Sequence, residues 1–180
     1  MKNDKQPPKV VAYTDGAFTK WGGGIAGWGA YITFDGRHKT IGGYLFDATS
    51  SVAELAGVIN VLRTVKRTKH PLIIRTDSKY VVSCANRGEK WRSAGWVTST
   101  GKPAANIEHV KELLSLLRKH REIRCVRILW VKGHDGEVGN EVADFVATQN
   151  KEIGYIISSA ESHDESEEFS PRALVKKFKT

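Results

Sequence analysis

Cysteine is scarce in this sequence: Cys84 and Cys125 are the two that 180 residues contain. A disulfide framework or a thiolate metal site needs more cysteines, so neither is expected to organise the fold. Both cysteines lie in apolar stretches and are interpreted as reduced packing residues. No segment approaches the roughly 18 consecutive apolar residues of a membrane helix, and the first residues, MKNDKQPPKV, lack the apolar core of a signal peptide. We therefore expect a cytoplasmic protein with no membrane partner.

Acidic residues are also in the minority, with 20 Asp and Glu against 28 Lys and Arg, which gives a formal net charge of +8. Residues 151–180 hold five basic and six acidic residues, so residues 1–150 carry 23 basic against 14 acidic ones, a net charge of +9. A basic domain commonly binds a polyanion through salt-sensitive phosphate contacts, although many basic domains bind none. Charge alone therefore leaves nucleic-acid binding open.

Periodicity predicts an α/β domain. Alternating or short apolar runs predict strands at 10–17, 28–34, 38–45, 71–77 and 125–131. Helical spacing of apolar residues predicts helices over 51–66, 78–86, 106–119 and from about 138. The dipeptide Asp35-Gly36 indicates a hairpin, and helices between the later strands indicate parallel crossovers. The expected fold is a mixed five-stranded sheet, three strands antiparallel and then two parallel, flanked by helices on both faces.

The ends of the chain differ from its middle. Residues 1–9 read as an N-terminal leader, and residues 10–150 form the expected domain. Residues 151–180 turn acidic and then basic, which predicts a flexible charged tail whose final RALVKKFKT could bind an unidentified partner.

Four acids occupy positions that suit one shared site. Asp15 ends the first strand, Asp77 ends the fourth, Glu54 opens the first helix and Asp144 lies in the last. If the first and fourth strands are neighbours, their aspartates end side by side, which is tolerable only with a cation between them. Carboxylate oxygens favour Mg²⁺ or Mn²⁺ over zinc, and two ions about 4 Å apart can promote phosphodiester hydrolysis.

Each acid also has a structural explanation, and taken singly that explanation is the better one. Glu54 completes the capping box S-x-x-E with Ser51. Asp77 precedes a helix start, where an acid suits the helix dipole. Asp15 could be a turn residue, and Asp144 a solvated helix position.

The joint pattern is what favours a site. TDGA at 14–17, AEL at 53–55, TDS at 76–78 and WVKGH at 130–134, followed by NEVAD at 140–144, occur in this order. The pattern resembles the type 1 ribonuclease H family over about residues 10–150. The resemblance implies the ribonuclease H-like fold with strand order 3-2-1-4-5 and a monomer. It also implies an endonuclease that hydrolyses the RNA strand of RNA–DNA hybrids and leaves 5′-phosphate and 3′-hydroxyl ends. Two Mg²⁺ ions, with Mn²⁺ as a possible substitute, would be bound by the four acids, Asp15, Glu54, Asp77 and Asp144.

The same resemblance implies roles for residues of the Gly-rich loop that follows the fifth strand. His134 would assist the reaction in proton transfer or product departure, whereas a surface histidine without a role is the alternative. Asn140 and Glu141 match the family's NE pair and could complete the second metal's shell. Asn140 could equally be a helix cap.

Substrate contacts are implied beside the metals, because carboxylates and magnesium cleave DNA and RNA alike. The basic segment 87–105 resembles the family's handle, although a solvated loop packed by its tryptophans is the alternative. Ser50 and Arg87 depart from the residues usual in the family, asparagine and tryptophan respectively. Asn106 could also be a plain helix cap. The implied substrate-binding residues are Gly16, Thr49, Ser50, Trp91, Trp96 and Asn106.

Three other functions remain open at this point. The most distant is a ribosome-related or structural scaffold, which would not need acids at two strand ends. The other two are closer. One is a catalytically silent module that binds hybrids, which the presence of all four acids and His134 argues against. The other is a DNA nuclease of the same fold.

Overall fold

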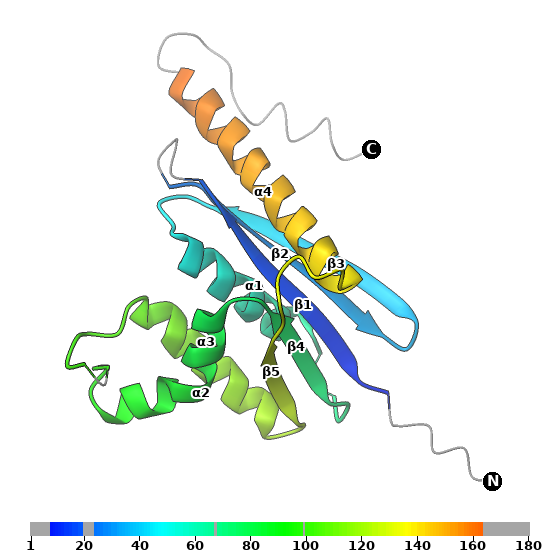
Figure 1. Ribbon diagram of the computed structural model, residues 1–180, viewed down its shortest axis with the longest axis vertical. Coiled ribbons are helices and arrows are strands. Elements are labelled where there is room, and N and C mark those ends of the chain that lie inside the picture. Colours follow the sequence, from blue (N-terminus) through cyan, green and yellow to red (C-terminus); the bar gives the residue numbers. More distant parts are fainter. Residues whose placement is uncertain (1–7, 20–23, 67, 99, 164–180) are drawn as a thin grey trace.

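The computed structural model describes residues 8–19, 24–66, 68–98 and 100–163. Within these residues the chain forms five strands and four helices (Figure 1). The strands are β1 (Val10–Phe18), β2 (Ala26–Phe34), β3 (Arg37–Leu45), β4 (Leu72–Thr76) and β5 (Val126–Trp130). The helices are α1 (Ser50–Thr64), α2 (Lys79–Ser93), α3 (Ile107–Arg121) and α4 (Val138–His163). Among the described residues no helix is long and apolar enough to cross a membrane.

The five strands form one sheet in the order β3-β2-β1-β4-β5, as predicted. β1 pairs antiparallel with β2 and parallel with β4, and β5 pairs parallel with β4. The turn between β2 and β3 places Asp35 at φ 49° and Gly36 at φ 75°, which is the backbone that a tight two-residue hairpin requires. The predicted hairpin and crossovers are therefore confirmed.

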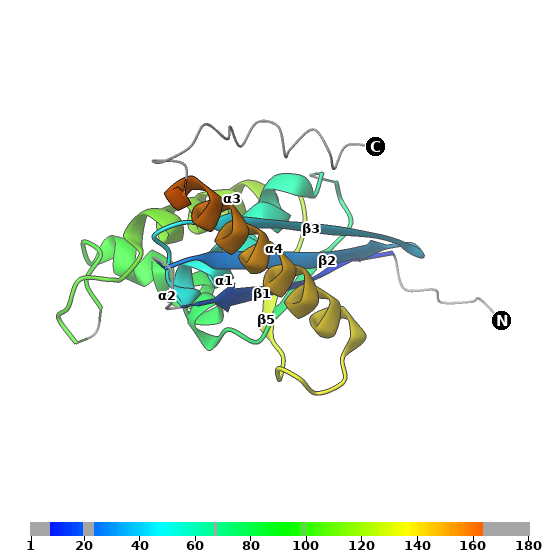
Figure 2. The same ribbon diagram turned by 90° about the horizontal axis from the view of Figure 1, so that it is seen from above.

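Helices cover both faces of the sheet (Figures 1 and 2). α1 packs on the face of Thr14, where Gly57 of the helix comes close, whereas α4 packs on the opposite face, with Gly139 against the Tyr13 ring. Successive residues of β1 point to opposite faces, which separates the two helices. α4 also lies close to β2, because a Cβ at Gly29 would overlap main-chain atoms of the helix.

The main hydrophobic core lies between the sheet and α1, α2 and α3. It is formed by the predicted apolar stripe of α1 with residues from β4 and the other two helices: Leu55, Val58, Ile59, Leu62, Leu72, Ile74, Val81, Val110, Leu113, Leu114 and Leu117. Of the two free cysteines, Cys84 is buried in this core. Cys125 is exposed, so the packing interpretation is wrong for that residue.

Helix α2 is longer than predicted, since it continues to Ser93 and takes in the first part of the segment 87–105. The sequence predicts an end near Asn86 because residues 87–105 are polar and basic and show too little periodicity for a core element. In the structure Gly88 is buried, and a Cβ there would lie 2.8 Å from a Leu114 methyl carbon. The glycine therefore permits close packing of α2 on α3, and Trp91 extends the buried face by one turn.

Helix α4 also exceeds its expected extent, because it runs through His163 rather than ending near residue 150. Gly154 lies against Tyr44 and Ile25, so the added turns are attached to the sheet. The predicted tail thus begins as helix, and its remainder, 164–180, lies outside the described residues. So does most of the predicted leader, residues 1–7.

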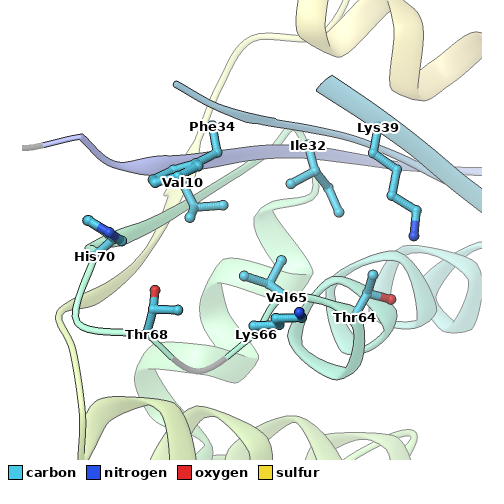
Figure 3. A pocket seen from close by; sticks show the side chains of 9 residues that line it. All are labelled: Val10, Ile32, Phe34, Lys39, Thr64, Val65, Lys66, Thr68 and His70. Carbon is cyan, nitrogen blue, oxygen red and sulfur yellow. The ribbon is translucent and has the colours of Figure 1, made fainter. Parts of the chain in front are cut away.

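A pocket opens at the end of the sheet where β1 begins (Figure 3). Val10, Ile32 and Phe34 contribute much of its apolar lining, and the Phe34 and His70 rings lie with centroids 4.9 Å apart. Asp15 is five residues further along β1, or about 16 Å at the usual rise of a strand. The pocket is therefore separate from the carboxylate site.

Candidate active site

The adjacent strands β1 and β4 deliver two of the predicted acids to one edge of the sheet. Thr14 pairs with Thr76 in parallel register, and each is followed by an aspartate, Asp15 or Asp77. α1 adds Glu54 from the face behind them. Ligand oxygens of these three residues lie within 4.8 Å of one another, and we call the group the buried cluster.

Glu54 is not explained by helix capping. The N-cap of α1 is Thr49, whose hydroxyl accepts a hydrogen bond from Val52 N, so the predicted capping box with Ser51 is wrong. Gly16 brings the helix close, because a Cβ at that position would lie 2.7 Å from Glu54 N. The Gly16 amide also donates to Asp15 Oδ1 at 2.7 Å.

Burial and mutual repulsion disfavour the ionised form of the three carboxyl groups in the buried cluster. Burial, followed by repulsion from Asp77, raises the pKa of Asp15 to about 7. Burial, followed by repulsion from Asp15, raises the pKa of Glu54 to about 9. Burial is also the main cause of the raised pKa of Asp77. A bound cation would reverse these shifts by favouring the ionised carboxylates.

The donor set fits a divalent metal ion. Glu54 Oε2 is buried and has no hydrogen-bond partner, which leaves an oxygen available to a ligand inside the cluster. Carboxylate oxygens are the ligands that Mg²⁺ and Mn²⁺ prefer. Gly133 lies directly beside Asp77, since a Cβ at Gly133 would lie 2.5 Å from Asp77 Oδ2. A side chain at residue 133 would thus occupy space beside the cluster.

Asp144, the fourth predicted acid, belongs to a neighbouring group. Its carboxylate lies within 4.8 Å of ligand atoms of His134 and Glu141, and we call these three residues the exposed cluster. The charge of Asp144 raises the pKa of both Asp15 and Asp77, whereas His134 lowers them, so the two clusters act on each other electrostatically.

The segment that carries His134 is attached to the end of β4. Val131 N donates to Thr76 O at 2.9 Å, and the Trp130 indole donates to Asp77 O at 2.9 Å. His134 itself has φ 51°, a left-handed conformation that is uncommon for residues other than glycine. Asn140 lies within the first turn of α4, buried and with both amide atoms unpartnered, so its predicted capping role is wrong.

The structure places the residues predicted to bind substrate in different environments. Thr49 and Ser50 are exposed at the start of α1. Asn106 stands at the N-cap position of α3 but makes no capping bond, and its amide donates instead to Tyr80 Oη at 3.1 Å. Trp91 and Trp96 pack against the main core. This packing agrees with the alternative interpretation of the segment 87–105, a loop packed by its tryptophans. Their contact with substrate remains a prediction.

Sequence reasoning missed a polar network beneath the site. Tyr13 Oη donates to Glu137 Oε1 at 2.9 Å, and the Arg75 guanidinium forms an ion pair with the same carboxylate. The available signal was Arg75 itself, a charged residue inside the otherwise apolar strand PLIIRT. A partly buried charge of this kind calls for a partner.

Solved structures share this arrangement of sheet and helices. The solution structure of the PFV RNase H domain superposes with a TM-score of 0.69 at 27% identity, and the match covers 81% of this chain and 96% of that domain. The fold is therefore ribonuclease H-like, with four helices around the mixed sheet of the described residues.

Sequence comparison identifies the family. The family model RNase H matches residues 7–152. Ribonuclease H of Francisella tularensis subsp. novicida is 42% identical over 158 residues, which are 87% of this chain and 99% of that protein. Ribonuclease H of Francisella philomiragia is 42% identical over 141 residues, which are 78% of this chain and 89% of that protein. The chain belongs to the RNase H family of endonucleases, and the resemblance seen in its motifs is confirmed.

Proposed function

We propose that this chain hydrolyses the RNA strand of RNA–DNA hybrids at the edge of the sheet where Asp15, Glu54, Asp77 and Asp144 converge. The products carry 5′-phosphate and 3′-hydroxyl ends. The observation that carries the proposal is the buried cluster, three mutually repelling carboxylates that include a buried, unpartnered Glu54 oxygen. A polar group in this state is costly unless a ligand satisfies it.

Two Mg²⁺ ions are the proposed cofactors, and Mn²⁺ can replace them. Asp15, Glu54 and Asp77 would hold the first ion, and Asp144 with Glu141 would contribute to the second. Bound there, the ions would supply an activated water and would stabilise charge on the leaving oxygen. The protein keeps the carboxylates in place through the paired strand ends and the close approach of α1 at Gly16.

His134 is the proposed group for handling protons. It is exposed and lies within 4.8 Å of ligand atoms of Asp144, so its imidazole can exchange a proton with water or with a departing product. Two glycines shape the loop that carries it: Gly133 passes close to Asp77 Oδ2, and Gly136 has φ 77°.

Recognition of the hybrid is assigned to the surface around the site. The Thr49 hydroxyl accepts a bond from the helix and keeps its own hydrogen to donate to a phosphate, at a helix N-terminus that favours anions. Ser50 adds a second hydroxyl, suited to a ribose 2′-hydroxyl, the group that distinguishes RNA from DNA. Gly16, Trp91, Trp96 and Asn106 complete the predicted contacts. We expect the protein to act as a monomer.

A cleavage assay on matched substrates tests the proposal. End-labelled RNA–DNA hybrid, RNA duplex and DNA duplex of one sequence are incubated with the protein and Mg²⁺, and the products are resolved on a gel. We expect cleavage of the RNA strand of the hybrid and little cleavage of either duplex. Preferential cleavage of the DNA duplex would instead favour a DNA nuclease of the same fold, and binding without cleavage would favour a silent module.

A further inference from the structure

The partners of the polar network beneath the site come from three separate segments. Tyr13 on β1 and Arg75 on β4 are direct partners in the parallel register, so their side chains lie on the same face of the sheet. Glu137 comes from the segment between β5 and α4. The Arg75 guanidinium also donates to Tyr13 Oη at 3.2 Å and lies 5.5 Å from the centre of the Tyr13 ring.

Two residues of the network, Tyr13 and Arg75, precede the aspartates of the buried cluster in sequence. Tyr13 is two residues before Asp15 within β1, so these two side chains share one face of the sheet, and Arg75 is two residues before Asp77, which directly follows β4. Glu137 therefore fastens its own segment to the strands that carry the metal-binding aspartates.

Glu137 also marks the end of the segment that carries His134. The beginning of this segment is fixed by Val131, which donates to Thr76 O. Its end is fixed twice: the Glu137 side chain binds the sheet, and the Glu137 main-chain oxygen accepts from Asn140 N at 2.8 Å and Glu141 N at 3.1 Å. His134 lies between these two anchors with a left-handed backbone, which surrounding contacts must maintain.

We propose that the Tyr13–Arg75–Glu137 network positions His134 over the buried cluster. Glu137 and Arg75 are positioning residues, because they act through the loop and make no contact with the carboxylates in the described structure. The inference rests on the proposed role of His134. Residues that orient metal ligands typically contribute about 10-fold to 100-fold in metal affinity or activity, and we expect an effect at the lower end of that range for residues that orient His134.

Steady-state kinetics on the hybrid tests this role. We expect Glu137→Gln, which keeps the shape of the side chain and removes its charge, to lower kcat about tenfold with KM unchanged. Arg75→Met should do the same, and Arg75→Lys should restore most of the rate because the ion pair can re-form. Glu112→Gln is the matched control, since Glu112 pairs with Arg63 at 2.5 Å away from the site, and it should leave kcat unchanged.

A double variant separates positioning from general stabilisation. In a His134→Ala background, Glu137→Gln should change kcat by less than about twofold, because the residue that it positions is absent. A tenfold loss that persists in that background, or a wild-type kcat for Glu137→Gln or His134→Ala alone, would overturn the inference. Asp77→Asn is assayed in parallel: full activity there would refute the proposed active site itself, whatever the Glu137 variants show.

Discussion

The buried and exposed clusters, which together form the proposed active site, carry their carboxylates on different supports. Asp15 and Asp77 are fixed by paired strand ends, in a setting whose burial raises their pKa values. His134 and Glu141 are exposed, on a loop and on the first turn of α4. The difference suggests a division of work: the buried cluster holds a metal in a preformed geometry, and the exposed cluster adapts to substrate and product.

The largest effect should come from the buried cluster. Asp77→Asn keeps the side-chain shape but removes a ligand charge, and we expect kcat to fall about a thousandfold, since metal-assisted charge stabilisation provides several kcal/mol. Affinity for the hybrid, measured by fluorescence anisotropy, should change little. Asp135→Asn is the control, because Asp135 pairs with Lys132 on the exposed loop outside both clusters. Near-normal cleavage by Asp77→Asn would refute the assignment.

A smaller effect is expected from the exposed cluster. Replacing His134 by alanine should lower kcat about a hundredfold, which is the lower range for loss of a proton-transfer group. Single-turnover and steady-state rates should be compared, because a role in product departure would reduce only the steady-state rate. If both clusters contributed equally, His134→Ala would be as inactive as Asp77→Asn.

The two clusters should also differ in how pH affects the metal-free protein. The raised pKa values mean that the folded state keeps protons on Asp15 and Glu54 after the unfolded chain has released them. Stability is therefore lost as pH rises from about 4 through about 7 and about 9. In EDTA, the Tm should fall between pH 5 and pH 9, and Mg²⁺ should reduce that fall.

Variants assign this pH dependence to the buried cluster. Glu54→Gln should flatten the decline of Tm and make the metal-free protein more stable than wild type at pH 9. Asp144→Asn should have a weaker effect, because Asp144 is only one of the smaller causes of the raised pKa of Asp15. A metal-free Tm that is higher at pH 9 than at pH 5, and unaffected by Glu54→Gln, would contradict the description of this cluster.

The smallest effect is expected from truncation at the end of the chain. Truncation after His163 should leave kcat and Tm unchanged, because both clusters and the packed part of α4 are retained. Truncation after residue 152 should lower Tm, since it removes Gly154 and its packing against Ile25 and Tyr44. Loss of activity in the longer, still folded fragment would show that residues 164–180 take part in the reaction.

The sheet was predictable because its signals are local. Alternating residues, the Asp35-Gly36 turn and the helical stripe around Leu55 each reflect neighbours in sequence. The grouping of acids became predictable when motif order was added to these patterns. Separately, each acid had a plausible structural role, and it was the position of the N-cap, at Thr49 rather than Ser51, that removed one of them.

The features that sequence reasoning missed depend on contacts between distant segments. The close packing of Gly88 against Leu114 of α3 joins two helices, and no local pattern indicates it. Asn106 reads as a cap, but its left-handed backbone turns its amide toward Tyr80. The ion pair of Arg75 joins residues 62 positions apart, a separation that no local pattern reports.

Manganese binding tests the preformed metal site most directly. Mn²⁺ is titrated into metal-free wild type, Asp77→Asn and Asp144→Asn without substrate, and the free ion is followed by its electron paramagnetic resonance signal. We predict that wild type and Asp144→Asn retain an ion, whereas Asp77→Asn loses that binding. Equal Mn²⁺ affinity in Asp77→Asn and wild type would contradict the central claim that the buried cluster holds the metal.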